Sequence, residues 1–279
     1  MQSPGRVSVR PTRLAVLLAI GLAGFLGVAG CAANRMVFQP SRLMEGSASD
    51  LKRPCEDVFF KASDGTRLNG WFYPAGTNST GFVVLLCHGN AGNISHRLPL
   101  IDILAKAGVN VFAFDYRGYG RSAGKPSEKG VYLDAQAAWD WLRSRGFSET
   151  NIIALGESLG GGVACELVTR KPLAGLILQS TFTSVPDVAA EMISWLPVRL
   201  LLTTRFNNQD KLKHIQIPVL ILHGRKDTII PFAHAEKNFA AIPTRAKYFA
   251  ELDGDHNDAS VISAEKYQRA VAEFLAKLN

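Results

Sequence analysis

This chain of 279 residues has no strong excess of one charge sign, only four cysteines and no repeated motif. Basic residues number 31 and acidic residues 24, with no Lys/Arg run, so nothing supports nucleic-acid binding. No Cys/His group has the spacing of metal ligands, and we expect no metal site. Apolar residues make up 47% of the chain and charged residues 20%, which argues against disorder. With no internal repeat, this length and composition favour one globular domain.

The N-terminal 30 residues differ from the rest. They contain three arginines and no acid, so the remaining chain carries 7 − 3 = +4 of the formal charge. The apolar run at residues 14–28 is shorter than the about 20 residues of a spanning helix, and its layout is that of a secretory signal peptide. We therefore predict a signal peptide over residues 1–30. An uncleaved N-terminal anchor helix is the alternative.

The apolar run ends in Val-Ala-Gly followed by Cys31, which resembles a bacterial lipobox. This resemblance implies cleavage before Cys31 and its lipidation, and hence a lipoprotein anchored in the membrane on the extracytoplasmic face of a bacterial envelope. Three cysteines then remain, an odd number that cannot all pair. Cys87 falls in a strand pattern and Cys165 in a helix pattern, so we expect both to be small buried hydrophobes.

Strand and helix patterns alternate after residue 54. A hairpin over residues 58–73 comes first, and continuous apolar runs typical of strands covered on both faces follow. These runs lie at residues 82–87, 109–114, 152–155, 176–178 and 219–222, with a weaker strand at 248–252. Helical patterns lie at 101–106, 131–145, 161–170 and 264–278. The alternation predicts a doubly wound α/β domain with a mostly parallel sheet over residues 55–279, preceded by a tether at residues 31–54.

About forty residues interrupt this alternation between the strands at 176–178 and 219–222. We predict that residues 181–215 form a helical cap, because long insertions in compact domains are more often functional than idle. Trp195, Leu196 and Leu200 are its candidate substrate-binding residues, as lining of an acyl pocket. The alternative is that these side chains only pack the cap against the body.

The segment Gly156-Glu157-Ser158-Leu159-Gly160 fits the G-x-S-x-G motif. A predicted strand precedes it and a helical pattern follows it, which is the context that the motif requires. Glycines are needed there because a serine on a sharp strand-to-helix turn tolerates no bulky neighbours. Ser158 is therefore the candidate nucleophile, and the alternative is an ordinary Gly/Ser loop.

A nucleophilic serine needs a base and a group that orients the base, and this fold provides them in the chain order Ser, Asp, His. Asp227 follows a strand, and His256 lies in a polar loop after the next one. Asp255 and Asp258 compete with Asp227, but their closeness to His256 favours loop or helix-cap roles. His234 falls in a helical pattern and is the weaker base.

Two backbone N–H groups are expected to bind the oxyanion of the tetrahedral intermediate. The first belongs to Leu159, the residue after the nucleophile, and we assign the second to Asn90 in the glycine-rich loop after the strand at 82–87. His88 opens this loop, where a structural hydrogen-bonding role is favoured over a catalytic one.

Five segments together resemble the α/β-hydrolase superfamily. They are HGNAGNISHR at 88–97, DYRGYGRS at 115–122, GESLG at 156–160, HGRKDTIIP at 223–231 and GDHND at 254–258. They are most similar to a membrane-associated branch of serine hydrolases that includes acyl-protein thioesterases and lysophospholipid or monoacylglycerol lipases. The match runs from about residue 35 to the C-terminus. It implies hydrolysis without a cofactor, a cap at residues 195–202, and a bracing role for Arg117. The Phe-Asn-Asn at 206–208 departs from the branch, which often has Phe-Asp.

The leading hypothesis is therefore a serine hydrolase that cleaves carboxylic ester or thioester bonds of acyl or lipid-like substrates through an acyl-enzyme. A serine peptidase of the same fold is one alternative. A non-catalytic binding protein is another, and the intact Ser158, Asp227 and His256 argue against it.

Overall fold

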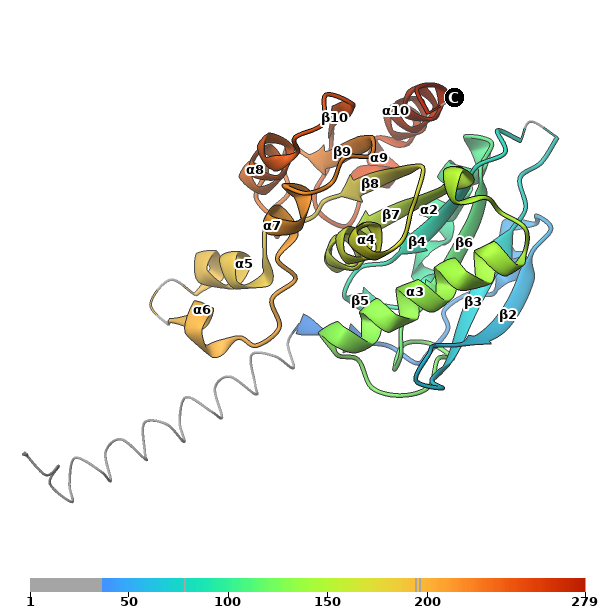
Figure 1. The fold of residues 1–279 in the computed structure, drawn as a ribbon, viewed down its shortest axis with the longest axis horizontal. Helices are drawn as coiled ribbons and strands as arrows, with labels where there is room; N and C mark the ends of the chain where they lie inside the picture. The colour runs from blue at the N-terminus through green and yellow to red at the C-terminus, as the bar shows by residue number, and fades with distance from the viewer. Residues whose placement is uncertain (1–36, 78, 194, 196, 279) are drawn as a thin grey trace, which may run out of the picture.

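The computed structural model describes residues 37–77, 79–193, 195 and 197–278. Its centre is a sheet of eight strands in the order β10-β9-β8-β7-β4-β6-β3-β2 (Figure 1). All neighbours from β10 to β6 are parallel, while β3 is antiparallel to both β6 and β2. The strands are β2 (Glu56–Lys61), β3 (Arg67–Tyr73), β4 (Val83–Cys87), β6 (Asn110–Asp115), β7 (Ile152–Glu157), β8 (Gly175–Gln179), β9 (Val219–Gly224) and β10 (Lys247–Leu252). The predicted fold class is confirmed.

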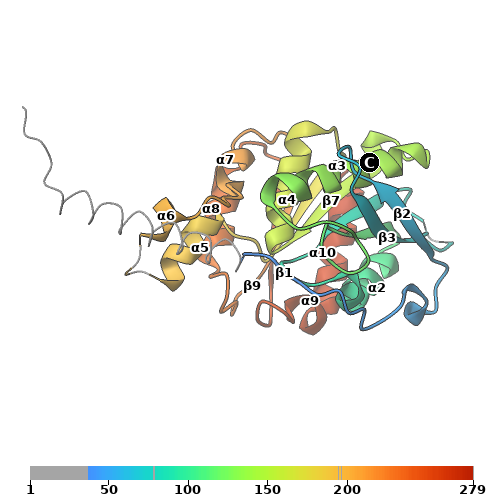
Figure 2. The ribbon, with the colours of Figure 1, turned by 90° about the horizontal axis from the view of Figure 1, so that it is seen from below.

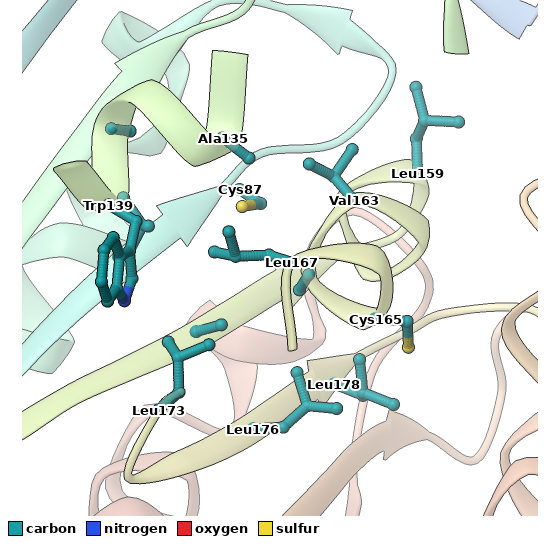
Figure 3. Close-up of a cluster of buried hydrophobic side chains, with 14 of the residues drawn as sticks. Cys87, Ala135, Trp139, Leu159, Val163, Cys165, Leu167, Leu173, Leu176 and Leu178 are labelled. Carbon is teal, nitrogen blue, oxygen red and sulfur yellow. The ribbon is translucent and has the colours of Figure 1, made fainter. Parts of the chain in front are cut away.

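Helices cover both faces of this sheet, which explains the apolar strands. On one face α3 (Glu128–Ser144) and α4 (Leu159–Arg170) pack against Val83, Leu85 and Cys87. On the other face α2 (Leu98–Lys106) and α10 (Ala264–Ala276) pack against Val84 and Leu86. Figure 2 shows the sheet between these two helical layers, and Figure 3 shows side chains of α3, α4, β4 and β8 meeting in the first core. Each fully buried Val or Leu stabilises the fold by about 1.5–3 kcal/mol.

The direction of winding changes at β4. The chain passes from β4 through α2 to β6 on one side, and then through α3 to β7 on the other side of β4. The loops that follow β4 and β7 therefore diverge and leave a crevice at the carboxyl ends of the strands, where open α/β sheets bind ligands.

The segment before residue 55 lies against this body from Val37 onwards. β1 (Gln39–Pro40) pairs in parallel with β5 (Ala91–Gly92), and the Tyr73 hydroxyl donates to the Ala48 carbonyl at 2.9 Å, within the short helix η1 (Ala48–Leu51). The described part of the predicted tether is thus packed chain rather than a free linker. The whole predicted signal, residues 1–30, and Cys31 lie outside the described residues.

The predicted cap contains three short helices after β8: α5 (Val185–Met192), α6 (Val198–Leu201) and α7 (Asn208–Leu212). His234 in α8 (Ala233–Ala241) connects the cap to the body, because its Nε2 lies 3.0 Å from the carboxylate of Glu191 in α5.

The remaining elements are the short helix α9 (Ala259–Ile262) and the 3₁₀ turns η2 (Ile94–Arg97) and η3 (Glu149–Asn151). None of the helices that the structure describes has the length and apolar content needed to cross a bilayer. Cys87 and Cys165 are buried free thiols, as predicted.

Candidate active site

Ser158 occupies the sharp turn between β7 and α4. Its backbone has φ 52° and ψ −114°, a conformation that costs an L-residue on the order of 1–3 kcal/mol. The glycines of the motif permit this turn: a Cβ on Gly160 would lie 1.9 Å from the Cys87 carbonyl oxygen, and one on Gly156 would lie 2.5 Å from that of Gly160. The turn lifts the serine side chain to the carboxyl edge of the sheet.

Three side chains from separate loops meet at this edge. His256, after β10, places Nε2 2.9 Å from Ser158 Oγ and Nδ1 2.8 Å from Asp227 Oδ2. Asp227 follows β9, and its other carboxylate oxygen accepts the backbone N–H groups of Ile229 at 3.0 Å and Ile230 at 2.7 Å. The structure therefore brings together the three residues that the sequence singled out, in the sequence of contacts that a serine nucleophile, its base and an orienting carboxylate require.

His223 is buried beside Asp227. Burial lowers the pKa of its imidazole, and its Nε2 lies 2.8 Å from the Ile230 carbonyl oxygen and 3.4 Å from Asp227 Oδ2. Of the two imidazoles near Asp227 Oδ2, that of His256 is the closer, at 2.8 Å against 3.4 Å for His223.

The carboxylates of Asp255 and Asp258 bond the backbone of the loop that carries His256 and not its imidazole ring. Asp255 accepts the backbone N–H groups of Thr228 and His256, both at 2.7 Å, and these bonds lower the pKa of Asp255. Asp258 accepts the N–H of Asp255 at 2.6 Å. Both side chains thus bond backbone of the loop, as predicted, and Asp258 stands at the N-cap position of α9 without a side-chain cap hydrogen bond. Asp255 also connects the loop of Asp227 to the loop of His256, a role that the sequence analysis missed.

The backbone N–H groups of Leu159 and Asn90, the two expected oxyanion donors, are held in position in different ways. Leu159 is the first residue of α4, where N–H groups have no partner within the helix. The Asn90 carbonyl accepts Gln39 N–H at 3.0 Å and the Tyr119 hydroxyl at 2.7 Å, while the N–H of Gly89 donates to Glu157 at 3.3 Å. Peptide groups on both sides of the Asn90 N–H are thus held, and among the described residues that N–H has no protein acceptor.

A buried ion pair supports this loop. Arg97 Nε donates to Glu157 at 2.9 Å, and its NH1 donates to the Ala91 carbonyl at 2.8 Å. Burial opposes the charge of Glu157, but the attraction and hydrogen bonds of Arg97 outweigh it and hold the pKa of the carboxyl below its usual value. The pair borders a cavity of about 410 Å³ that also contacts Gln179 and Asn257. Both residues stand within recognisable motifs, but nothing in the sequence pairs them.

His88 and Arg117 have the structural roles expected of them. His88 is fully buried, its Nδ1 lies 2.8 Å from the Gly89 carbonyl, and burial lowers the pKa of its ring to about 3. The guanidinium of Arg117 binds Asp134 at 2.8 Å and Asp64 at 2.7 Å, which ties its loop to α3 and to the first hairpin. Among the described residues, no group of three His, Cys, Asp or Glu side chains is arranged to hold a metal ion.

The candidate cap residues lie on the outside. Trp195 is 82% exposed and Leu200 84% exposed, so neither lines an enclosed acyl pocket here, and Leu196 falls outside the described residues. The inward positions of the cap belong to Val198 and Leu202, which are buried. A substrate-binding role for Trp195, Leu196 and Leu200 stays a prediction.

Known proteins resemble this chain in sequence and in fold. The family described as serine aminopeptidase, S33, matches residues 79–212. An uncharacterized protein of Mycobacterium tuberculosis is 37% identical over 88% of this chain and 87% of its own length. The alpha/beta hydrolase domain-containing protein WAV2 of Arabidopsis thaliana is 35% identical over 80% and 79%.

Among solved structures, the esterase Pf2001 of Pyrococcus furiosus superposes with a TM-score of 0.70 at 26% identity, over 86% of this chain and 97% of its own. An alpha-beta hydrolase of Vibrio vulnificus gives a TM-score of 0.69 over 98% of both chains, and its identity of 22% shows the fold alone. Together with the parallel sheet and the turn at Ser158, these likenesses place the chain in the α/β-hydrolase superfamily, and it is a hydrolase of that family.

Proposed function

We propose that this hydrolase is a serine esterase whose nucleophile is Ser158. The observation that carries the proposal is the pair of contacts at His256, 2.9 Å to Ser158 Oγ and 2.8 Å to Asp227 Oδ2, formed by loops that lie far apart in the sequence. Pf2001, whose name describes it as an esterase, supports the ester as substrate class.

The geometry supports a two-step acyl transfer. Ser158 Oγ attacks the carbonyl carbon of the ester and gives its proton to His256 Nε2, while the ionised Asp227 holds Nδ1 and stabilises the imidazolium. The carbonyl oxygen becomes an anion that the N–H groups of Leu159 and Asn90 bind. When the tetrahedral adduct collapses, His256 returns the proton to the leaving alcohol or thiol. Water then attacks the acyl-serine by the same route and releases the acid.

A fluorophosphonate probe and a series of p-nitrophenyl esters test this proposal. We expect labelling at Ser158, and Ser158→Ala, His256→Ala and Asp227→Asn should each lose at least about 10³-fold in kcat/KM. The matched control is Ser144→Ala on the exposed end of α3, which should keep full activity. Retained esterase activity in purified Ser158→Ala would overturn the assignment. Faster cleavage of aminoacyl amides than of esters would instead favour the peptidase that the family description names.

We also propose that the chain is anchored as a lipoprotein through Cys31 and acts on acyl or lipid-like substrates at the membrane. The support is the apolar run at residues 14–28 that ends in Val-Ala-Gly-Cys. Stable anchoring needs two or more acyl chains, which this modification provides. Intact mass of membrane-extracted protein should show an N-terminus at acylated Cys31, and Cys31→Ser should release or misprocess the protein. A mature chain that begins at Met1 would contradict the lipoprotein.

A further inference from the structure

Three large apolar side chains lie on the outside of the cap with no partner in its packing. Met192 ends α5, Trp195 stands in the following turn and Leu200 lies in α6, with exposed fractions of 66%, 82% and 84%. We call these three residues the cap face. The cap has inward residues of its own, Val198 and Leu202, so the cap face is not needed to hold it on the body. Because α5 packs against α6, these exposed apolar residues lie on neighbouring elements, and an apolar patch of this kind marks an interaction surface.

The cap face lies at the end of the molecule where the described chain begins. The ring of Phe38 lies 6.1 Å from that of Phe206, two residues before α7, and both views show β1 at the base of the cap (Figures 1 and 2). The proposed acylated residue, Cys31, stands 37 − 31 = 6 residues before Val37. Six residues span at most about 22 Å when extended. A bilayer that holds the acyl chains of Cys31 therefore lies within about that distance of Val37, on the side of the molecule where the cap lies.

We propose that the cap face inserts into the headgroup and upper acyl region of a phospholipid bilayer when the chain is anchored by its N-terminus. Tryptophan is suited to this depth, because its ring is apolar and its indole N–H can bond at the headgroup level. Arg199 lies in the same segment and pairs with Asp187 at 3.0 Å, while its side chain stays 63% exposed. A guanidinium has five N–H donors, so those not bound to Asp187 can bond lipid phosphate in the proposed pose. This proposal rests on the proposed membrane anchor and does not depend on the catalytic assignment.

The insertion would also orient the active site. The cap follows β8, and the Gln179 carbonyl at the end of β8 accepts the backbone N–H of Ser158 at 2.9 Å. A cap resting on lipid thus brings the carboxyl edge of the sheet towards the bilayer, where acyl substrates reside.

Tryptophan fluorescence with brominated lipids tests the insertion directly. The chain has four tryptophans, of which Trp71 and Trp139 are buried, Trp141 is half-buried and Trp195 alone is exposed. The full chain is reconstituted in phosphatidylcholine and phosphatidylglycerol vesicles, with and without bromine on the acyl chains. We expect bromine to quench part of the emission, and Trp195→Phe to abolish that quenching.

Two further variants separate insertion from loss of fold. Met192→Ser with Leu200→Ser should reduce the quenching of Trp195 at least about twofold. The matched control, Val261→Ser with Ile262→Ser, changes exposed apolar residues on α9 and should leave it unchanged. Equal quenching in wild type and Trp195→Phe, or no quenching in a chain that floats with vesicles, would overturn the proposal. An emission shift with protein concentration in lipid-free detergent would overturn it in favour of a second copy of the chain.

An activity assay on the same samples separates a failure of the membrane contact from a failure of the esterase proposal. Hydrolysis of p-nitrophenyl acetate, a water-soluble ester, is measured beside the quenching. Full hydrolysis without quenching would refute the membrane contact and leave the esterase proposal standing. Quenching that persists in Ser158→Ala supports the contact whatever the fate of the nucleophile.

Discussion

Replacing Arg97 with methionine tests whether Glu157 is held as a carboxylate inside the domain. The two side chains are 12% and 20% exposed and are joined at 2.9 Å, so the variant leaves a largely buried carboxylate without its cation. Breaking such a pair by removing one partner costs about 3–5 kcal/mol, because the remaining charge is neither hydrated nor neutralised. For a domain of this size that corresponds to a fall in Tm of roughly 6–20 °C.

The cost should depend on pH with a defined sign. In the wild type the pKa of Glu157 is below its usual value, so the carboxyl stabilises the folded state above the unfolded pKa of about 4.3, and this stability is lost as the pH falls through the folded pKa. Without Arg97, we expect burial to outweigh the remaining hydrogen bond from the Gly89 N–H and to raise the pKa of Glu157. The variant therefore loses stability relative to wild type as the pH rises from about 4, over roughly the 2–4 pH units that 3–5 kcal/mol represent.

Urea unfolding at pH 5 and pH 8 measures both quantities. The gap in unfolding free energy between wild type and Arg97→Met should be larger at pH 8. The double variant Arg97→Met, Glu157→Gln removes the stranded charge and should regain about half of the loss or more. A cost below about 1 kcal/mol at pH 8, or a double variant no more stable than the single one, would show that the pair is not what keeps this loop in place.

Three further predictions concern single groups around the site. Tyr119→Phe removes the hydroxyl that donates to the Asn90 carbonyl, beside the proposed oxyanion donor, and steady-state ester kinetics should show kcat lower by roughly 2–10-fold at unchanged KM; a change confined to KM would count against it. Burial raises the pKa of Asp115 to about 7, so wild-type stability should fall as the pH rises from about 4 to 7, and urea unfolding of Asp115→Asn should lack that fall. Gly160→Ala places a Cβ 1.9 Å from the Cys87 carbonyl, and circular dichroism should show no folded protein, whereas a folded and active variant would refute the steric argument.

The central sheet was predictable because its signals are local. Runs such as residues 82–87 and 219–222 are apolar on both faces, which a parallel strand between helical layers requires and few other elements tolerate. The same logic brought Ser158, Asp227 and His256 together, since loops that follow parallel strands open at one edge of the sheet. Their expected catalytic roles stay predictions until the labelling and kinetics are done.

Features that depend on contacts between distant segments were not predictable. Arg97 and Glu157 are 60 positions apart, and the pattern around each gives no reason to pair them. The direction of the cap side chains was equally hidden, because α6 is only four residues long and too short for a helical period to separate its faces. Residues 37–54 lack periodicity, yet β1 still pairs with β5 through backbone groups, whose bonding no side-chain pattern records.

The turn at Ser158 shows why a site and its supports must be considered together. A non-glycine residue at φ 52° is strained, and strain of on the order of 1–3 kcal/mol persists only where surrounding contacts over-determine the conformation. Here the Ser158 N–H donates to the Gln179 carbonyl at 2.9 Å, and the Thr181 hydroxyl donates to the Ser158 carbonyl at 2.7 Å. Two such bonds, each contributing about 1 kcal/mol, together offset a strain of about 2 kcal/mol, the middle of that range. Both come from the end of β8, so the neighbouring strand that leads into the cap is also what holds the serine in position.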